Sequence, residues 1–581
     1  MKSPPKFAAR CYALASILPL LAMGAAPAHA ATPVNAAKGA EQLCGGLDQR
    51  ALADLVIESV QPHAAGPGPV APVPPGMTPP PAPILPAHCE VIGHTEQRVG
   101  RDGQNYAIRF HLRLPEAWNG GFFFQGGGGS DGDLGDAVGA MGVSPPALAR
   151  GYAVLSQDSG HDNTTNFDPK RGGTLAFGFD PLARTNYGHA SLQKSVLAAR
   201  KVIAARYGQA PKHSYFVGCS KGGQEGMALV QRYPTLFDGV VVTAPGMSLP
   251  RAAIGEAWNT KSFSFSAANG HGPLTPLSIA QGFSDGDFAL ARKAILRACD
   301  KLDGLADGMI LAVGQCTSAR VLPAFNALRC KSAKTNTCLT GEQITALQRV
   351  NSGPRNSRGQ SIYPGFPWDA GWGAADWRIW QLGTADGRVP SLNMLMGAGA
   401  LASIFSVPPQ ALAPGAEGGL AFQMALDLDR AEQGILARGG DFATSGWDDV
   451  SARSTDLSGF LGHGGRLMVL HGGSDPVFSI ADTLDWYRAM LARNGVAAQT
   501  NTRFFAVPAM NHCTGGPATD QYAAFDAMVA WVEQHKAPER IIARAGPASP
   551  FPGRERPLCA FPKIARYRGG DPEKAESFIC S

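Results

Sequence analysis

One stretch of the chain decides the fold: Ser214-Tyr215-Phe216-Val217-Gly218-Cys219-Ser220-Lys221-Gly222. An apolar strand pattern runs into Gly-x-Ser-x-Gly, and residues 223–232 continue with helical spacing. A strand, a tight turn and a helix in this order form an elbow that exposes a serine above a sheet, and the glycines are needed because side chains there would clash. The pattern therefore predicts an α/β fold with Ser220 as its nucleophile.

Gly-x-Ser-x-Gly alone is a weak signal in a chain with 71 glycines. A second copy exists, Gly128-Gly129-Ser130-Asp131-Gly132, but no helix pattern follows it. A glycine-rich loop after an early strand is instead where such folds place an oxyanion-hole amide. We expect the Gly129 N–H to be one donor, with Gly128 the near alternative, and the Lys221 N–H to be the second. A flexible loop without chemistry is the other interpretation.

The surrounding sequence alternates between strand and helix patterns. This rhythm predicts a mainly parallel sheet with helices on both faces. The predicted strands cover residues 106–114, 122–124, 152–156, 214–217, 239–242, 466–471 and 503–507, and the predicted helices cover 189–207, 223–232, 480–494 and 520–535.

The rhythm breaks between Pro245 and the strand at 466, which indicates a domain-sized insertion. With 581 residues, 44% of them hydrophobic, the chain is too long for one compact unit. We predict a core in two parts, 31–246 and 462–581, the second including the C-terminal tail, and a lid domain at 247–461. The first part contains a Pro-rich segment, 61–88, expected to be extended along the surface.

The N-terminus has the pattern of a signal peptide over residues 1–30. A basic start precedes an apolar stretch, Tyr12 to Met23, and Ala28-His29-Ala30 is typical of a cleavage site. The stretch is too short to cross a bilayer comfortably, so a retained membrane anchor is the less favoured alternative. We therefore expect a secreted or periplasmic protein. A net charge of +5 without long basic runs gives no support to a nucleic-acid partner.

Cysteine usage agrees with export. Removal of residues 1–30 takes Cys11 from the eleven cysteines and leaves ten, an even number that suggests five disulfides. Short spacings favour Cys299–Cys316, Cys330–Cys338 and Cys559–Cys580. Metal–thiolate binding is not indicated because the chain has no CxxC pair.

An acid and a histidine follow two later strands. Asp475 comes after the strand at 466–471, and His512 comes after the strand at 503–507. The chain order serine, aspartate, histidine is that of α/β-hydrolases, and differs from the orders in chymotrypsin and subtilisin. We predict that Ser220 attacks a carbonyl, that His512 takes and returns the proton, and that Asp475 fixes the imidazole tautomer. A structural or solvated histidine is the alternative.

Cys219 precedes the serine, and Cys513 follows the histidine. With Asp475, these two pairs resemble the signature of the tannase and feruloyl esterase family. The resemblance covers nearly the whole mature chain, and the stretches at 160–163 and 507–513 support it. It implies an α/β-hydrolase core with a lid domain, a Cys219–Cys513 disulfide and a Cys44–Cys89 disulfide.

The resemblance also implies a structural Ca²⁺ site in the lid. The matching run is Cys299-Asp300-Lys301-Leu302-Asp303-Gly304-Leu305-Ala306-Asp307-Gly308-Met309. Carboxylates separated by glycines suit a hard cation, although the spacing is wider than that of an EF-hand. By the family pattern Asp300, Asp303 and Asp307 bind through their side chains, and Leu305 and Met309 through their carbonyls. An acidic solvated turn is the alternative.

Three residues are candidates for substrate binding. Four tryptophans lie within residues 368–380, and lid tryptophans are most often core, but Trp380 matches an aromatic wall in the family. Phe478 matches an aromatic clamp. Arg388 is the candidate partner for a substrate carboxylate, a natural bidentate pairing, with a solvated surface arginine as the alternative.

Together these features predict a serine carboxylesterase that acts on a small aromatic ester, such as a terephthalate monoester, a feruloyl ester or a galloyl ester. An α/β-hydrolase-fold peptidase and a catalytically idle aromatic-ligand binding protein are the alternatives. No residue pattern determines the oligomeric state, and we expect a monomer.

Overall fold

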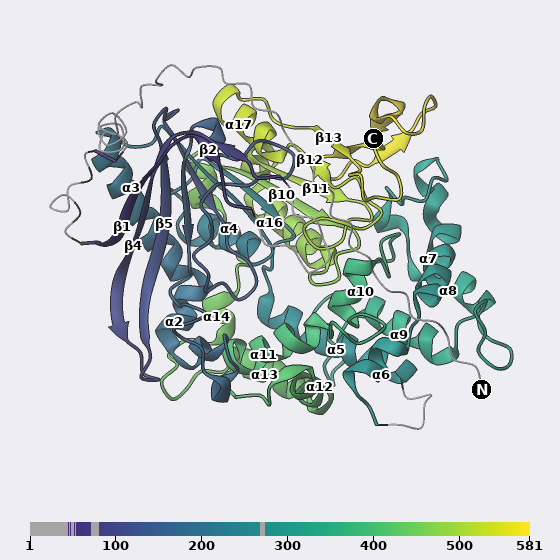
Figure 1. Cartoon of the computed structure of the whole chain (residues 1–581). Helices are drawn as coiled ribbons and strands as arrows, with labels where there is room; N and C mark the ends of the chain where they lie inside the picture. Colours follow the sequence, from purple (N-terminus) through teal and green to yellow (C-terminus); the bar gives the residue numbers. More distant parts are fainter. Residues whose placement is uncertain (1–43, 46, 48–51, 53, 71–80, 268–272) are drawn as a thin grey trace, which may run out of the picture.

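A large mixed sheet forms the centre of the computed structural model, which describes residues 44–45, 47, 52, 54–70, 81–267 and 273–581 (Figure 1). The described chain contributes nine strands to it. Their order is β1 (Val56–His63), β4 (His88–Val99), β5 (Asn105–Pro115), β7 (Ala153–Gln157), β6 (Gly121–Gln125), β8 (His213–Cys219), β9 (Gly239–Thr243), β10 (Arg466–Gly472) and β11 (Thr502–Val507). Neighbours are parallel from β7 to β11 and antiparallel from β1 to β7.

The α/β-hydrolase prediction is confirmed, and all seven predicted strands are present. Strands β1 and β4 were not predicted; they pair with each other at the edge of the sheet. The two ends of the Pro-rich segment 61–88 belong to these strands, because β1 extends to His63 and β4 begins at His88. Every residue of β1 is exposed or half-buried, so no apolar alternation marks it in the sequence. Residues 1–30 and 71–80 lie outside the described residues.

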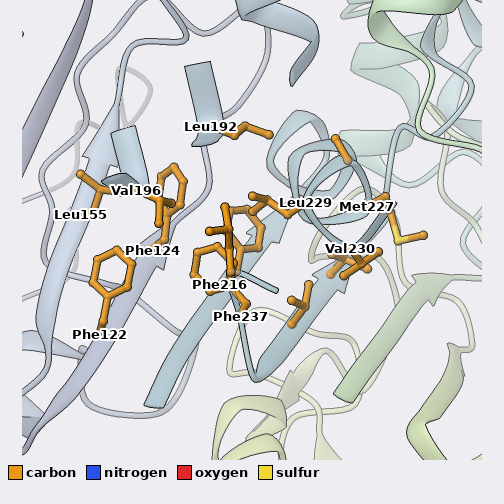
Figure 2. Close-up of a cluster of buried hydrophobic side chains, with 14 of the residues drawn as sticks. Phe122, Phe124, Leu155, Leu192, Val196, Phe216, Met227, Leu229, Val230 and Phe237 are labelled. Carbon is orange, nitrogen blue, oxygen red and sulfur yellow. The ribbon is translucent and has the colours of Figure 1, made fainter. Parts of the chain in front are cut away.

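Helices cover both faces of the sheet. On one face lie α3 (Ser191–Tyr207), α4 (Lys221–Arg232) and α16 (Ile480–Asn501), and on the other lies α17 (Ala524–Gln534). The strands alternate between these faces, as a period of two requires. Phe122 and Phe124 of β6 pack towards α3 and α4 (Figure 2), whereas Phe123 packs towards α17.

Between β9 and β10 the described chain forms helices and no long strand. The labelled ones gather along the lower and right-hand sides of the view in Figure 1. They are α5 (Leu249–Ala267), α6 (Pro276–Gln281), α7 (Asp285–Cys299), α8 (Ser318–Ala327), α9 (Gly341–Ser352), α10 (Ala375–Gln381), α11 (Ala398–Ala400), α12 (Gly415–Ala425), α13 (Leu428–Leu436), α14 (Gly446–Val450) and α15 (Ser458–Gly462). Seven of them, α5 to α10 and α12, contribute to a separate core that includes the fully buried Trp368, Trp372 and Trp377, whereas Phe460 and Leu461 of α15 pack in a core of the sheet.

Residues after α17 form a small cap of β13 (Arg540–Arg544) and β14 (Glu555–Cys559), which pair with each other, and of β15 (Ala565–Tyr567) and β16 (Phe578–Cys580), which form a second ribbon. The predicted helix at 520–535 starts only at Ala524, because residues 521–522 pair with β13 instead. The described residues form five disulfides, in the five predicted pairs. None of the described helices is both long and apolar enough to span a membrane.

Candidate active site

Ser220 occupies a strained elbow between β8 and α4. Its φ of 63° and ψ of −121° lie where residues with a side chain are rare, and such strain is typical of a nucleophile elbow. The chain packs closely on itself here. A Cβ at Gly218 would lie 2.5 Å from the Gly222 carbonyl oxygen, and one at Gly222 would lie 2.6 Å from that of Gly127. The two glycines of the motif are therefore required by backbone contact.

His512 and Asp475 form the acid–histidine pair that the chain order predicted. The carboxylate lies 2.9 Å from His512 Nδ1 and accepts N–H bonds from Val477 and Phe478 at 2.8 and 3.0 Å. Burial alone would raise the pKa of Asp475, but the charges and hydrogen bonds of His512 and His471 hold that pKa well below its ordinary value. Asp475 is therefore ionised, and its bond to Nδ1 leaves Nε2 as the basic nitrogen.

The nucleophile and the histidine are brought together by Cys219–Cys513, whose Cα atoms are 6.0 Å apart. This bond joins the residue before Ser220 to the residue after His512. The Nε2 atom of His512 is buried and has no hydrogen-bond partner among the described residues. It is therefore free to accept a proton from a hydroxyl on the cavity side.

An apolar cavity opens in front of Ser220. Trp380 and Phe478 line it and place their rings edge-on to the His512 ring, each at 5.4 Å between centroids. The cavity is lined by Gly129, Ser130, Leu175, Tyr187, Ser220, Lys221, Leu249, Ala253, Glu256, Trp380, Met396, Gly397, Ala400, Ile404, Phe405, Val477 and Phe478. The structure thus brings both predicted aromatic residues and both predicted oxyanion donors to one cavity.

The predicted oxyanion donors, Gly129 and Lys221, line the same cavity as Ser220. The Gly128 N–H is already used, because it donates to Asp131 Oδ1 at 2.8 Å. Within the described residues the N–H groups of Gly129 and Lys221 donate to no protein acceptor. This difference favours Gly129 over the alternative, Gly128.

A buried charge cluster fixes the loop that carries Gly129. Lys221 Nζ lies 3.0 Å from Asp131 and 3.1 Å from Glu225, and all three side chains are almost completely buried. Asp131 holds the Gly128 N–H, and Glu225 holds the Gly127 N–H at 2.9 Å. Burial would lower the pKa of Lys221, but the two carboxylates raise it, so the ammonium stays charged.

The insertion between β9 and β10 also contacts both catalytic loops through Asp369. This fully buried carboxyl accepts the Ala509 N–H at 2.7 Å and the Ser474 hydroxyl at 3.0 Å. Ser474 precedes the catalytic aspartate, and Ala509 lies on the loop that leads to His512. One side chain of the insertion therefore connects the acid loop to the histidine loop.

Arg388 is not brought to this cavity. Its side chain is 86% exposed, pairs with Asp386 two residues earlier, and is not among the residues that line the cavity. The prediction that it anchors a substrate carboxylate therefore fails on position. Residues 384–389 form a turn in which Arg388 bonds to Asp386 and the Val389 N–H bonds to Thr384. The neighbouring sequence does not indicate this solvent-exposed arrangement.

The aspartate-rich loop lies in the insertion, apart from the residues that line the cavity. Asp300 and Asp303 accept backbone N–H groups of their own loop, and Asp307 pairs with Arg556 of the C-terminal cap. Burial and the neighbouring carboxylates raise the pKa of Asp303 to about 6. Within the described part of the chain, no three acidic, histidine or cysteine side chains converge closely enough to hold a metal.

Several residues of the site were not predicted. His471 contacts Asp475, Glu256 lines the cavity, and Asp369 binds the loops that carry Asp475 and His512. Glu256 alone carried a usable signal. It follows Leu249 and Ala253 at helical spacing, so an acid stands on an apolar helix face. The others depend on contacts between distant segments.

The elbow, the acid–histidine pair and the two free amides define an α/β-hydrolase-fold enzyme equipped for ester hydrolysis. A family model described as tannase and feruloyl esterase matches residues 89–581. The chain belongs to this family and is a carboxylic ester hydrolase.

Comparisons with individual proteins are consistent with this family. The chain is 41% identical over 520 residues to the mono(2-hydroxyethyl) terephthalate hydrolase of Piscinibacter sakaiensis, which covers 86% of each chain. It is 27% identical over 522 residues to a probable feruloyl esterase of Arthroderma benhamiae, with 86% of this chain and 88% of that protein covered. Feruloyl esterase B of Aspergillus oryzae shares the fold with a TM-score of 0.70 at 21% identity, over 93% of this chain and 99% of that chain.

Proposed function

We propose that the protein is an exported serine esterase that hydrolyses esters of aromatic carboxylic acids through an acyl-enzyme. The observation that carries the proposal is the strained Ser220, coupled by Cys219–Cys513 to a histidine whose Nδ1 is held by Asp475. The apolar cavity with Trp380 and Phe478 suits an aromatic acyl ring. The candidate substrates are terephthalate monoesters, feruloyl esters and galloyl esters.

The first half of the reaction forms the acyl-enzyme. Ser220 Oγ attacks the ester carbonyl carbon while its proton passes to His512 Nε2. The Gly129 and Lys221 N–H groups stabilise the negative charge that develops on the carbonyl oxygen. The bond to the alcohol then breaks, and His512 gives its proton to the leaving oxygen.

The second half returns the free enzyme. Water loses a proton to His512 and attacks the acyl carbon, the same two N–H groups bind the oxyanion, and His512 returns a proton to Ser220 Oγ as the aromatic acid leaves. Asp475 stays ionised and keeps the imidazole in the required tautomer, because its two backbone N–H bonds stabilise the carboxylate.

Pre-steady-state kinetics on a chromogenic aryl ester test the proposal. We expect a burst of one alcohol per enzyme, and we expect Ser220→Ala to lose turnover by several orders of magnitude. A peptidase would instead favour aminoacyl anilides over esters of the same acid. An idle binding protein would leave Ser220 unreactive towards a fluorophosphonate probe.

Export is the second part of the proposal. Five disulfides among the described residues suit an oxidising compartment, and the N-terminal sequence has the signal-peptide pattern. N-terminal sequencing of the protein recovered from outside the cytoplasm should read from Ala31. A start at Met1 in that fraction would contradict cleavage after residue 30.

A structural calcium site in the lid is the third part. The donor set of Asp300, Asp303 and Asp307 with the Leu305 and Met309 carbonyls is all oxygen, as Ca²⁺ prefers. In the structure these carboxylates are bonded to backbone amides and arginine, so binding requires Asp307 to rearrange away from Arg556. The ion would stabilise the loop beside the C-terminal cap and take no part in the reaction.

A further inference from the structure

Glu256 is a buried acid without a protein partner inside the catalytic cavity. It lies on α5, where Leu249, Ala253 and Glu256 are spaced four and three residues apart and line the cavity from one helix face. Glu256 is only 6% exposed. Within the described residues its carboxyl makes no hydrogen bond or ion pair, although buried polar groups are almost always bonded.

The absence of a side chain at Gly397 leaves room for the Glu256 carboxyl. Gly397 lies against Glu256 Oε2, and a Cβ at that position would overlap with the oxygen. The rest of the nearby wall is apolar, with Ile404, Phe405 and Val477. A carboxyl in such a wall is not expected to stabilise the fold, because an unpaired buried polar group costs free energy.

The other ionisable side chains in the cavity wall are already engaged. Lys221 is bonded to Asp131 and Glu225, and the Tyr187 hydroxyl donates to the Gly129 carbonyl at 3.3 Å. Lys221 is also the one basic side chain among the described residues that line the cavity. A substrate carboxylate would therefore find no free cation there and would face Glu256 instead.

Burial, with a smaller contribution from the charge of Asp475, raises the pKa of Glu256 to about 8. A carboxyl that is neutral at pH 7 both accepts and donates a hydrogen bond. Either protonation state accepts a bond from a hydroxyl group. A substrate carboxylate is disfavoured because the cavity wall offers it no free cation, and the ionised fraction of Glu256 repels it.

We propose that Glu256 is a specificity-determining residue that binds a phenolic hydroxyl on the aromatic ring of the substrate and disfavours a ring carboxylate. The inference rests on the proposed esterase function and narrows its substrates to esters of hydroxylated aromatic acids. Terephthalate monoesters, which carry a free carboxylate on the ring, become poor substrates under this assignment.

The test compares substrates that differ in one group. For the wild-type protein, kcat/KM should be at least about tenfold higher for methyl 3- or 4-hydroxycinnamate than for methyl cinnamate, because the analogue leaves the buried carboxyl unbonded. It should be lower for monomethyl terephthalate than for methyl benzoate. A hydroxyl preference below about twofold for both hydroxycinnamates overturns the proposal without any variant.

Two variants of similar side-chain size localise the effect. Glu256→Leu should reduce the hydroxyl preference to within about twofold, whereas Glu256→Gln, which still accepts a hydrogen bond, should keep most of it. Above pH 8, where Glu256 is mostly ionised, Glu256→Gln should also improve the relative rate with monomethyl terephthalate. An unchanged preference in Glu256→Leu, in protein whose Tm matches the wild type, contradicts the assignment. If the variants do not fold, inhibition of the wild type by 4-hydroxycinnamate and by cinnamate gives the same comparison.

Failure of the esterase proposal gives a different result. If Ser220→Ala hydrolyses methyl cinnamate at the wild-type rate, the catalytic assignment is wrong whatever the hydroxyl preference. If Ser220→Ala is inactive but the hydroxyl preference is absent, only the role of Glu256 is wrong.

Discussion

The charge cluster of Lys221, Asp131 and Glu225 predicts that one side chain supports both the stability and the oxyanion hole of the enzyme. We consider the substitution Lys221→Met, which keeps the backbone N–H and much of the side-chain length but removes the ammonium. Two buried carboxylates, 3.0 and 3.1 Å from the lost charge, would then repel each other without compensation.

The expected magnitude follows from this burial. Removal of one partner from a buried ion pair costs about 3–5 kcal/mol of the free energy of unfolding. Asp131 and Glu225 also hold the Gly128 and Gly127 N–H groups, so their movement displaces the adjacent Gly129 donor. Loss of one oxyanion-hole donor lowers kcat by about 10²–10³-fold, and a displaced donor should approach the lower of these values.

Urea unfolding gives the stability change, and kcat on an aryl ester well below the Tm gives the catalytic change. Lys194→Met is the matched control, because Lys194 pairs with Glu96 at the surface, where the pair is worth about 1 kcal/mol or less. The double variant Lys221→Met/Glu225→Gln should recover part of the lost stability. If Lys221→Met unfolds at the same urea concentration as the control and keeps its kcat, the cluster does not support the oxyanion loop.

Three further predictions follow from other contacts. Burial raises the pKa of Asp369 to about 6, so the folded state binds this proton more tightly than the unfolded state. The stability that this group contributes is therefore lost as pH rises through 6. The unfolding free energy of the wild type minus that of Asp369→Asn should fall by about 1 kcal/mol from pH 5 to pH 7, and a constant difference would contradict this prediction. Replacing Cys219–Cys513 by alanines should cost about 2–5 kcal/mol and lower kcat even in folded protein, whereas loss of Cys330–Cys338, which lies in the insertion, should leave kcat unchanged. Equal effects on kcat would refute the positioning role. A chelator should lower the Tm and excess Ca²⁺ should restore it, with little response in Asp303→Asn; a Tm insensitive to the chelator would remove the calcium proposal.

The sequence was sufficient for the parts of the fold that are governed by local pattern. The central parallel strands are buried on both faces and therefore read as apolar runs, and the elbow at Ser220 has its own glycine requirement. Edge strand β1 carries no such pattern, since all its residues retain solvent contact and its partner β4 is interrupted by polar residues.

The site divides in the same way. Ser220, Asp475 and His512 were predicted because each follows a strand, and chain order restricts the roles. Arg388 was misplaced because only the folded turn shows its pairing with Asp386. Asp369 was missed because its role depends on contacts with loops that are distant in the sequence. Ser474 and Ala509 lie 105 and 140 residues further along the chain.

The central claim is that Ser220, and no other serine, forms a covalent intermediate with the acyl group. Rapid acid quench with an activated aryl ester, followed by peptide mass spectrometry, measures this directly. The account predicts one acyl group per chain on the peptide that contains Ser220, and no adduct in Ser220→Ala. An adduct on Ser130, which has the second Gly-x-Ser-x-Gly sequence and lines the same cavity, or turnover with no adduct at all, would contradict it.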